Sequence, residues 1–329
     1  MVKPMKIKGP RGPVEKELEE VERELETALC SNRPLIRKVG KHLLSTRGKR
    51  FRPMILLLSA RLNGKNLHPL AVCAATVVEL IHTATLIHDD SIDKSELRRG
   101  FPTVNSVWDD DVSVAMGDFI YSKAFSILVN NKMYDVMQVL AETSHRMSAG
   151  EMLELEKRND LDITEEDYLM IISDKTASLI SAACEIGAML ASPHDGTREC
   201  LCQYGHSLGL AFQITDDLFD FVGRAEVLGK SVGNDIRGGK FTLPLIATLK
   251  NASSKDRARI HDIIAKSAFA DGKWEELLAL MDEYEGISYS RKRALAFADE
   301  AKQTIRPFES SPAHAHLCSA VDFTVERTQ

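Results

Sequence analysis

The middle of this 329-residue sequence lacks proline, since none occurs between Pro102 and Pro193. Because a proline inside a helix costs about 3 kcal/mol, this stretch permits long helices. The sequence also lacks a series of alternating apolar and polar segments, and it lacks a repeat of fixed period. These absences argue against a sheet-based architecture and against a repeat array.

Further absences limit the class of protein. No apolar run reaches the length of about 18 residues that a membrane span needs, so we expect no spanning segment. Acidic residues outnumber basic ones, 48 to 42, and the net charge of −6 argues against a nucleic-acid partner. The six cysteines are scattered, which is typical of a reducing cytoplasmic protein. Residues 1–13 lack the apolar core of a secretory signal, and we expect a flexible tail there.

Apolar residues recur at helical spacing in the rest of the chain. A stripe begins at Val14 and continues through Leu29 among Glu and Arg. Residues 70–88, 112–130 and 175–191 are apolar nearly throughout, which predicts helices that are buried on most sides. We therefore expect an all-α fold over residues 14–329, a single domain of about a dozen helices in which outer helices surround a central bundle.

Two carboxylate clusters each follow an apolar stretch and share the pattern Asp-Asp-x-x-Asp. They are Asp89, Asp90 and Asp93, and Asp216, Asp217 and Asp220. Positions i and i+4 share one face of a helix, so each cluster would form an array of like charges that costs stability without a cation. Magnesium takes oxygen ligands and commonly binds through carboxylates together with substrate phosphates. The clusters therefore predict a metal-bound, phosphorylated ligand.

Basic residues of the kind that hold phosphate oxygens lie close to these clusters in the sequence. They form a compact turn at Gly48–Pro53, follow the first cluster at Arg98 and Arg99, and recur at Lys175, Lys230 and Lys240. Each one alone is more simply a solvated charge. Together they strengthen the prediction of a diphosphate site.

These motifs resemble those of the trans-prenyl diphosphate synthases, most of all the bacterial long-chain members that make octaprenyl diphosphate. The resemblance covers about residues 30–327 and rests on residues 81–100, Met116–Tyr121, Phe212–Asp220 and the Gly-Lys pairs at 229–230 and 239–240. It implies the isoprenoid synthase fold, with helices around a central cavity. One departure is Arg47, where the family usually has a second glycine before Gly48.

The resemblance also implies residue roles. Both aspartate clusters match metal-binding positions, commonly for three magnesium ions that bridge to the allylic diphosphate. Residues that match the allylic diphosphate site are Arg98, Lys175, Lys230 and Lys240. Residues that match the isopentenyl diphosphate site are Lys49, Arg52, His82 and Arg99. Thr176 and Gln213 match positions that line the reacting centre.

The implied reaction is ionisation of the allylic C–O bond, attack by the isopentenyl double bond, and loss of a proton. Alternatives remain open: a shorter-chain geranylgeranyl or farnesyl diphosphate synthase, a terpene cyclase, or a non-catalytic synthase subunit. A cyclase needs no isopentenyl site, and non-catalytic subunits typically lose aspartates that this chain retains. The family also implies a homodimer packed through residues 112–130, with Val112, Ala115, Phe119 and Ile120 as an apolar stripe. A peripheral membrane contact for product release is a further expectation.

Product length is expected to depend on the helix before the first cluster. A bulky aromatic at the fourth or fifth position before Asp89 stops growth early in the family, and Thr85 and Ala84 here are small. Ile81 and Val77, deeper in the helix, are not aromatic either. About 20 residues from Pro69 to Asp89 would line roughly 30 Å at 1.5 Å per residue. This length predicts a long product of about eight isoprene units, with these four residues as the floor of the tunnel.

Overall fold

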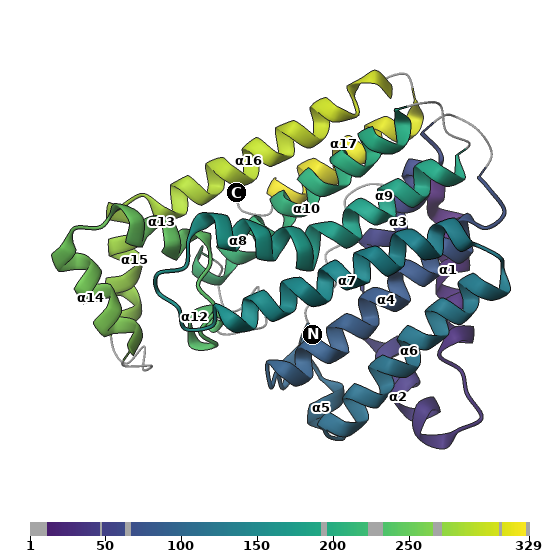
Figure 1. Cartoon of the computed structure of the whole chain (residues 1–329), viewed down its shortest axis with the longest axis horizontal. Helices are drawn as coiled ribbons and strands as arrows, with labels where there is room; N and C mark the ends of the chain where they lie inside the picture. Colours follow the sequence, from purple (N-terminus) through teal and green to yellow (C-terminus); the bar gives the residue numbers. More distant parts are fainter. Residues whose placement is uncertain are drawn as a thin grey trace. The chain divides into compact units, whose positions relative to one another are not determined.

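The computed structural model describes residues 12–46, 48–62, 67–191, 196–222, 233–265, 272–308 and 311–326. The fold is all-α, as predicted (Figure 1). In the described part of the chain the only strands are two of two residues each, which pair as a hairpin. The chain divides into two compact units. The expectation of a single domain over residues 14–329 stays a prediction. Of the expected tail 1–13, residues 1–11 lie outside the described residues, and Gly12 and Pro13 belong to the 3₁₀ turn η1 (Gly12–Val14).

Unit 1 comprises residues up to 143, 179–205 and 304–320. Its elements after η1 are α1 (Glu15–Ala28), α2 (Pro34–Ser45), α3 (Phe51–Ala60), α4 (Ala71–Ile92), β1 (Leu97–Arg98), β2 (Phe101–Pro102), α5 (Val104–Val107), α6 (Asp110–Asn130), the first part of α7 (Tyr134–Glu156), most of α9 (Ser178–Leu190), the first part of α10 (Thr197–Val222), η3 (Arg306–Phe308) and most of α17 (Pro312–Glu326).

Unit 2 comprises residues 144–178, 206–303 and those from 321 on. Besides the remaining parts of α7, α10 and α17, its elements are α8 (Glu165–Ile172), the π-helical turn η2 (Ser173–Ala177), α12 (Asn234–Arg237), α13 (Leu243–Asn251), α14 (Ser254–Ala265), α15 (Lys273–Glu283) and most of α16 (Gly286–Thr304). The spacing of Thr164 and Asp167 predicts a capping box with Asp in place of the usual Glu, and the structure confirms it at the start of α8.

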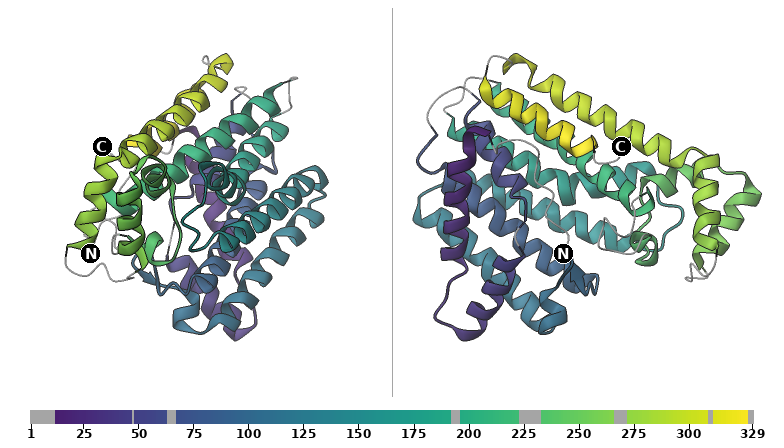
Figure 2. Two further views of the ribbon diagram at one scale, coloured as in Figure 1. Left: turned by 60° about the vertical axis from the view of Figure 1, so that its left-hand side comes forward. Right: turned by 180° about the vertical axis from the view of Figure 1, so that it is seen from behind.

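Helix α4 is the core helix of unit 1 and packs against α1, α3 and α6. In Figure 1, α6 lies in front of α4, whereas α1 is in front in the view from behind (Figure 2, right). Neighbours on both sides explain why α4 is apolar nearly all round, as the sequence predicted for residues 70–88. Its buried residues include Val77, Leu80 and Ile81, each 0% exposed.

Helix α6 differs from the prediction for residues 112–130. Its buried face consists of Ser113, Met116, Gly117, Ile120, Ala124 and Leu128, and its opposite face is open, with Val114 49% and Val129 47% exposed. The prediction of burial on most sides was wrong because apolar content alone does not show how many neighbours a helix has. Ile120 is 0% exposed and belongs to the core, so it does not share the open face.

Among the described residues, two helices, α4 and α6, are long and apolar enough to cross a membrane by length and composition alone. The expectation that no segment spans a membrane stays a prediction, because the core helix of a soluble protein meets the same criterion. In α4, 61% of the most apolar window is buried in the protein, as in the core helix of a soluble protein; in α6 the share is 33%.

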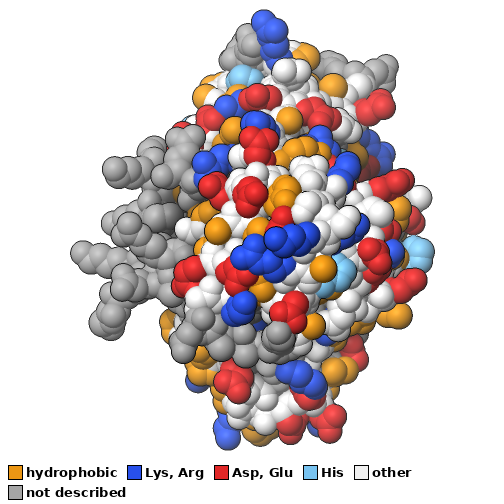
Figure 3. All heavy atoms as spheres, turned by 90° about the vertical axis from the view of Figure 1, so that its left-hand side faces the viewer, with side chains coloured by type: hydrophobic (Ala, Val, Ile, Leu, Met, Phe, Trp, Pro, Cys, Tyr) orange, Lys and Arg blue, Asp and Glu red, His pale blue; other side chains and the backbone are white. Residues whose placement is uncertain are grey.

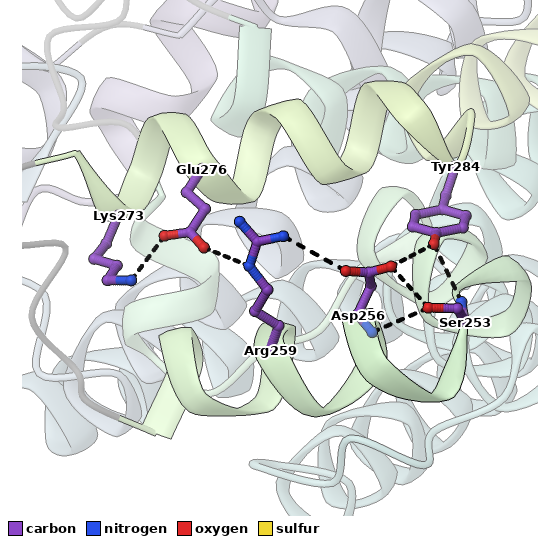
Figure 4. Close-up of polar contacts among 6 residues, drawn as sticks. All are labelled: Ser253, Asp256, Arg259, Lys273, Glu276 and Tyr284. Carbon is purple, nitrogen blue, oxygen red and sulfur yellow. Dashed lines mark hydrogen bonds and ion pairs between the residues drawn. The ribbon is translucent and has the colours of Figure 1, made fainter.

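In unit 2, α14 and α15 are tied together by a line of polar contacts (Figure 4). The residues are Ser253, Asp256, Arg259, Lys273, Glu276 and Tyr284. Arg259 Nε donates to Glu276 at 2.7 Å, and Tyr284 Oη donates to Asp256 at 2.8 Å. On the face drawn in Figure 3, acidic and basic side chains are mixed and neither kind forms a large patch of its own.

Candidate active site

The first aspartate cluster lies at the C-terminal end of α4. Asp89 and Asp90 belong to its last turn, and Asp93 caps it. The Asp93 N–H donates to the Asp89 carbonyl at 2.8 Å, so helical geometry continues to the end of the cluster. Positions i and i+4 share a face in that geometry. Asp89 and Asp93 are half-buried, whereas Asp90 is only 6% exposed.

Asp90 is paired with a side chain from the β1–β2 hairpin. Arg98 Nε donates to both Asp90 carboxylate oxygens at 2.9 Å, and Arg98 Nη2 lies 2.7 Å from Oδ1. The hairpin turns at Arg99 and Gly100, with φ of 54° and 79°, the positive values that a tight two-residue turn requires. The structure therefore brings together one predicted metal-binding residue and one predicted diphosphate-binding residue.

A pocket of unit 1 lies beside this ion pair. Its lining includes His82, Arg98 and Arg99, all predicted to hold diphosphate, and Glu79, which the sequence analysis did not assign. Arg52 reaches the lining through its Nη1, which lies 3.0 Å from His82 Nε2. Cationic and hydrogen-bonding groups thus converge on one pocket, as a diphosphate site requires.

The imidazole of His82 is held in one protonation state. Burial, followed by the nearby charges of Arg52 and Arg99, lowers the pKa of His82 well below its ordinary value. A guanidinium can only donate, so His82 Nε2 accepts from Arg52 and Nδ1 keeps the proton. His82 is therefore a neutral side chain with one N–H donor available at neutral pH.

The basic turn after α2 is anchored by a buried ion cluster. Arg50, at φ 55°, donates through Nη1 to Glu79 at 2.8 Å and through Nε to Glu22 at 2.8 Å. These bonds raise the Arg50 pKa although burial opposes them. A side chain at Gly48 would lie 2.6 Å from Arg99 Nη1, so glycine lets Arg99 lie over the turn. Lys49, between them, is exposed.

The second aspartate cluster lies near the C-terminal end of α10, in unit 2. Asp216 and Asp220 are half-buried, and Asp217 is 6% exposed. Asp220 accepts hydrogen bonds from the N–H groups of Asn234 at 3.1 Å and Asp235 at 3.0 Å. Its carboxylate therefore satisfies the first two backbone N–H groups of α12. Burial raises the pKa of Asp217 to about 7.

Thr176 and Gln213, predicted to line the reacting centre, are hydrogen-bonded to each other at 2.9 Å. Gln213 Nε2 also donates to Asp217 Oδ1 at 2.7 Å, and Tyr168 Oη donates to Asp217 Oδ2 at 2.6 Å. These four side chains come from α8, η2 and α10. They form a continuous hydrogen-bonded chain.

Lys175 and Thr176 lie in η2, where the Ser178 N–H donates back to the Ser173 carbonyl. Widened π-helical turns of this kind occur frequently at functional sites. Two glycines make room for it: a Cβ at Gly209 would lie 2.5 Å from Ala177 Cα, and a Cβ at Gly150 would lie 2.9 Å from the Lys175 nitrogen. Neither glycine was identified from the sequence.

Lys175 and Lys240 share one carboxylate. Their Nζ atoms lie 2.9 Å and 2.8 Å from Glu154 Oε1, and Lys175 also pairs with Glu151. Burial alone would raise the Glu154 pKa, but the two lysines outweigh it and the pKa is lowered. The structure therefore brings these two predicted diphosphate-binding lysines together. Lys230, the third, lies outside the described residues.

The residues predicted to limit product length are on α4. Val77, Ile81 and Ala84 are 0% exposed, and Thr85 is half-buried. Ala84 and Thr85, the two positions nearest the first aspartate cluster, carry small side chains.

The partners of the predicted site residues were missed by the sequence analysis: Glu22, Glu79, Glu151, Glu154 and Tyr168. Glu79 gave a usable signal, because it is a lone acidic residue within the apolar segment 70–88. Tyr168 gave none, since it begins an apolar run and reads as a core residue.

The oxygen donors of both clusters suit a divalent cation, because carboxylate oxygens are the ligands that magnesium and calcium prefer. In the described part of the chain no three such side chains already converge on one point. The buried Asp217, whose pKa is raised by burial, is a group that a cation would stabilise in its charged form. We expect the clusters to hold such a cation rather than to be solvated helix ends.

The raised pKa of Asp217 predicts a pH-dependent stability. Its folded-state pKa of about 7 lies above the ordinary 3.8, so between these values the folded protein binds a proton that the unfolded chain has released. Stability of the metal-free protein therefore falls as pH rises through this window. Asp217→Asn removes this effect, so in EDTA its melting temperature should rise relative to wild type as pH goes from about 5 to about 8. The exposed Asp135→Asn is the control, and a difference that does not change with pH contradicts the assignment.

Comparisons with known proteins identify the family of the chain. Residues 33–281 match the family model of the polyprenyl synthetases. Octaprenyl diphosphate synthase of Escherichia coli is 37% identical, over 91% of this chain and 92% of that protein. Geranylgeranyl diphosphate synthase of Methanosarcina mazei is 34% identical over 88% and 89%.

Solved structures show the same fold. A decaprenyl diphosphate synthase from Rhodobacter capsulatus superposes with a TM-score of 0.90 at 36% identity, covering 96% of this chain and 97% of that one. A polyprenyl synthase from Caulobacter crescentus, complexed with calcium and isoprenyl diphosphate, has a TM-score of 0.90 at 33% identity and 98% and 100% coverage. Together with the paired aspartate clusters, these matches establish that the chain belongs to the polyprenyl synthetase family, the prenyltransferases that make trans-polyprenyl diphosphates.

Proposed function

We propose that this enzyme is a magnesium-dependent synthase with a long-chain product, which adds isopentenyl diphosphate repeatedly to an allylic diphosphate. The observation that carries the proposal is that each unit holds a complete aspartate cluster and cationic side chains bound to buried carboxylates. In unit 1 Arg98 is bound to Asp90, and in unit 2 Lys175 and Lys240 are bound to Glu154. The direct test is incorporation of labelled isopentenyl diphosphate by the isolated chain, with farnesyl diphosphate and magnesium, and product length read after dephosphorylation.

In unit 2, we assign the allylic half of the reaction to η2 and its neighbours. Lys175 and Lys240 would bind the diphosphate, exchanging their bonds to Glu154 for bonds to phosphate oxygens. Each unit-charge pair at 4 Å contributes about 4 kcal/mol at an effective dielectric near 20, so several such contacts are needed to hold the charge of a leaving diphosphate. Lys230 would add a third. Thr176 and Gln213 would offer oxygen atoms to the developing positive charge.

In unit 1, we assign the pocket to isopentenyl diphosphate. Lys49, Arg52 and Arg99 would bind its phosphate oxygens, and the Nδ1–H of the neutral His82 would donate one further hydrogen bond. Because the pKa of His82 is lowered, this side chain would add no positive charge to the site near neutral pH.

We propose magnesium, as about three ions, for the aspartate clusters. Bound there, it would neutralise charge that develops on the leaving diphosphate. Asp90 would act mainly on Arg98, which it already binds, while Asp89 and Asp93 present their carboxylates from one helix face.

Two alternatives have specific counter-arguments. A non-catalytic subunit would lose aspartates, and both clusters are complete here. A terpene cyclase would not need the pocket of unit 1 with its Arg52–His82 pair. A shorter-chain product is the serious competitor, because relatives include a geranylgeranyl diphosphate synthase.

We further propose a cytoplasmic homodimer that touches membranes only to release product. All six cysteines lie in the described part of the chain and are free thiols, which suits a reducing compartment. The open face of α6, which includes Ala115 and Val114, would pack against a second copy.

The first prediction of the proposed function concerns the metal-binding carboxylates. Asp89→Ala or Asp216→Ala should reduce turnover by several orders of magnitude, because each removes an oxygen ligand from an array that binds the cation. Far-UV circular dichroism should show unchanged helix content. Asp135→Ala, at an exposed aspartate of α7, should keep wild-type turnover. Near-normal activity of either cluster variant at saturating magnesium would refute the metal assignment.

The second prediction concerns product length, expected to be about eight isoprene units. Ala84→Phe places a ring one helical turn before the cluster and should shorten the product to about three or four units. Because Ala84 is 0% exposed, the ring also overpacks the core, so Thr85→Phe, at a half-buried site, is the second variant. Ala301→Phe, equally buried on α16, should destabilise without shortening. Wild-type products of three or four units, or unchanged length in both α4 variants, would end the long-chain proposal.

The third prediction concerns assembly. Light scattering at micromolar concentration should give about twice the chain mass of 36.6 kDa. Ala115→Glu puts a charge on the open face of α6 and should give monomers. Thr27→Glu, at an exposed position of α1, adds the same charge and should remain dimeric. A wild-type monomer mass rules out the dimer.

A further inference from the structure

Tyr168 lies at one end of the hydrogen-bonded chain of unit 2. It is 3% exposed and lies within α8, seven residues before Lys175 in the sequence. Its ring packs in the hydrophobic core of the unit, and its hydroxyl donates to Asp217 Oδ2 at 2.6 Å. Burying a hydroxyl or a carboxylate without a hydrogen-bond partner costs free energy, so the bond between Tyr168 and Asp217 stabilises both groups in the interior.

The hydrogen-bonded chain has one direction when Asp217 is ionised. The carboxylate can then only accept, so Gln213 turns its Nε2 toward Oδ1, where the distance is 2.7 Å. The amide oxygen of Gln213 then faces Thr176 at 2.9 Å, and the Thr176 hydroxyl must donate to it. With its proton used in this way, the Thr176 oxygen offers lone pairs, and not a proton, to any group bound at η2.

The hydrogen bond from Tyr168 to Asp217 is the first of this hydrogen-bonded series, and the orientation of the Asp217 carboxylate depends on it. Asp217 is 6% exposed, and its two carboxylate oxygens are held by Tyr168 on one side and by Gln213 on the other. Without the tyrosine hydroxyl, Oδ2 would be a buried acceptor lacking that donor, and the carboxylate would rotate toward another one. Rotation would release Gln213, and with it the orientation of Thr176.

We propose that Tyr168 is a positioning residue for the prenyl transfer, which fixes Thr176 as an acceptor facing the positive charge of the allylic group by way of Asp217 and Gln213. The proposal rests on the proposed function. It assigns no contact between Tyr168 and substrate, because the residue acts through three other side chains.

The test is Tyr168→Phe, which keeps the ring in the core and removes only the hydroxyl. We expect kcat to fall about tenfold, as for loss of a hydrogen bond to a charged group, while KM for both diphosphates changes less than about twofold. Tyr289→Phe is the matched control: Tyr289 is also in unit 2 and donates to the Glu165 carboxylate at 2.8 Å, outside the chain. Both variants should lose similar thermal stability, and only Tyr168→Phe should lose kcat.

A double-mutant cycle separates positioning from general weakening. Thr176→Val removes the hydroxyl at the far end of the chain, so adding Tyr168→Phe to it should lower kcat by less than about twofold further. Additive losses, or equal kcat losses in Tyr168→Phe and Tyr289→Phe, would overturn the inference. Wild type that incorporates no isopentenyl diphosphate would instead refute the proposed function, so the two failures are distinguishable.

Discussion

The cost of removing charge from water governs both groups of site residues. Asp90 and Asp217 are each 6% exposed, and each is held by donors: Arg98 for the first, Tyr168 and Gln213 for the second. Buried charge is tolerated in proteins only when it is paired or hydrogen-bonded. The hairpin positions Arg98 beside Asp90, and α8 and α10 position Tyr168 and Gln213 beside Asp217. The half-buried aspartates of each cluster lie on the same helices as these buried, hydrogen-bonded carboxylates.

Small residues make that arrangement possible. Gly48 lets Arg99 lie across the basic turn, and Gly209 lets the backbone of η2 approach α10. In each case a part of the site gains its place because a neighbour has no side chain of its own. At Gly209 the close contact is with the backbone of η2, so an added methyl group would force the backbone to move, whereas at Gly48 it is with the flexible end of Arg99.

The helical fold and the identity of most site residues were accessible from the sequence, because they depend on local patterns. The apolar segment 70–88 gave α4, and Thr164 gave the start of α8. The open face of α6 was not accessible, since burial depends on which helices happen to lie beside it. Tyr168 and Glu154 were missed for the same reason. Tyr168 contacts Asp217, which lies 49 residues away in the sequence, and Glu154 contacts Lys175 and Lys240, which lie on other elements. Sequence patterns identify which groups carry the chemistry, whereas long-range contacts decide which groups orient them.

The chain has two tryptophans, and each lies near one of the two sites. Trp108 meets His42, which lines the pocket of unit 1, with ring centroids 5.5 Å apart. Trp274 stacks on Phe221, next in sequence to Asp220, at 6.0 Å, and a Cβ on Gly233 would touch it at 2.7 Å. Each unit therefore carries its own intrinsic fluorophore, and single tryptophan-to-phenylalanine variants would let the two substrates be followed separately by their emission, without any added label.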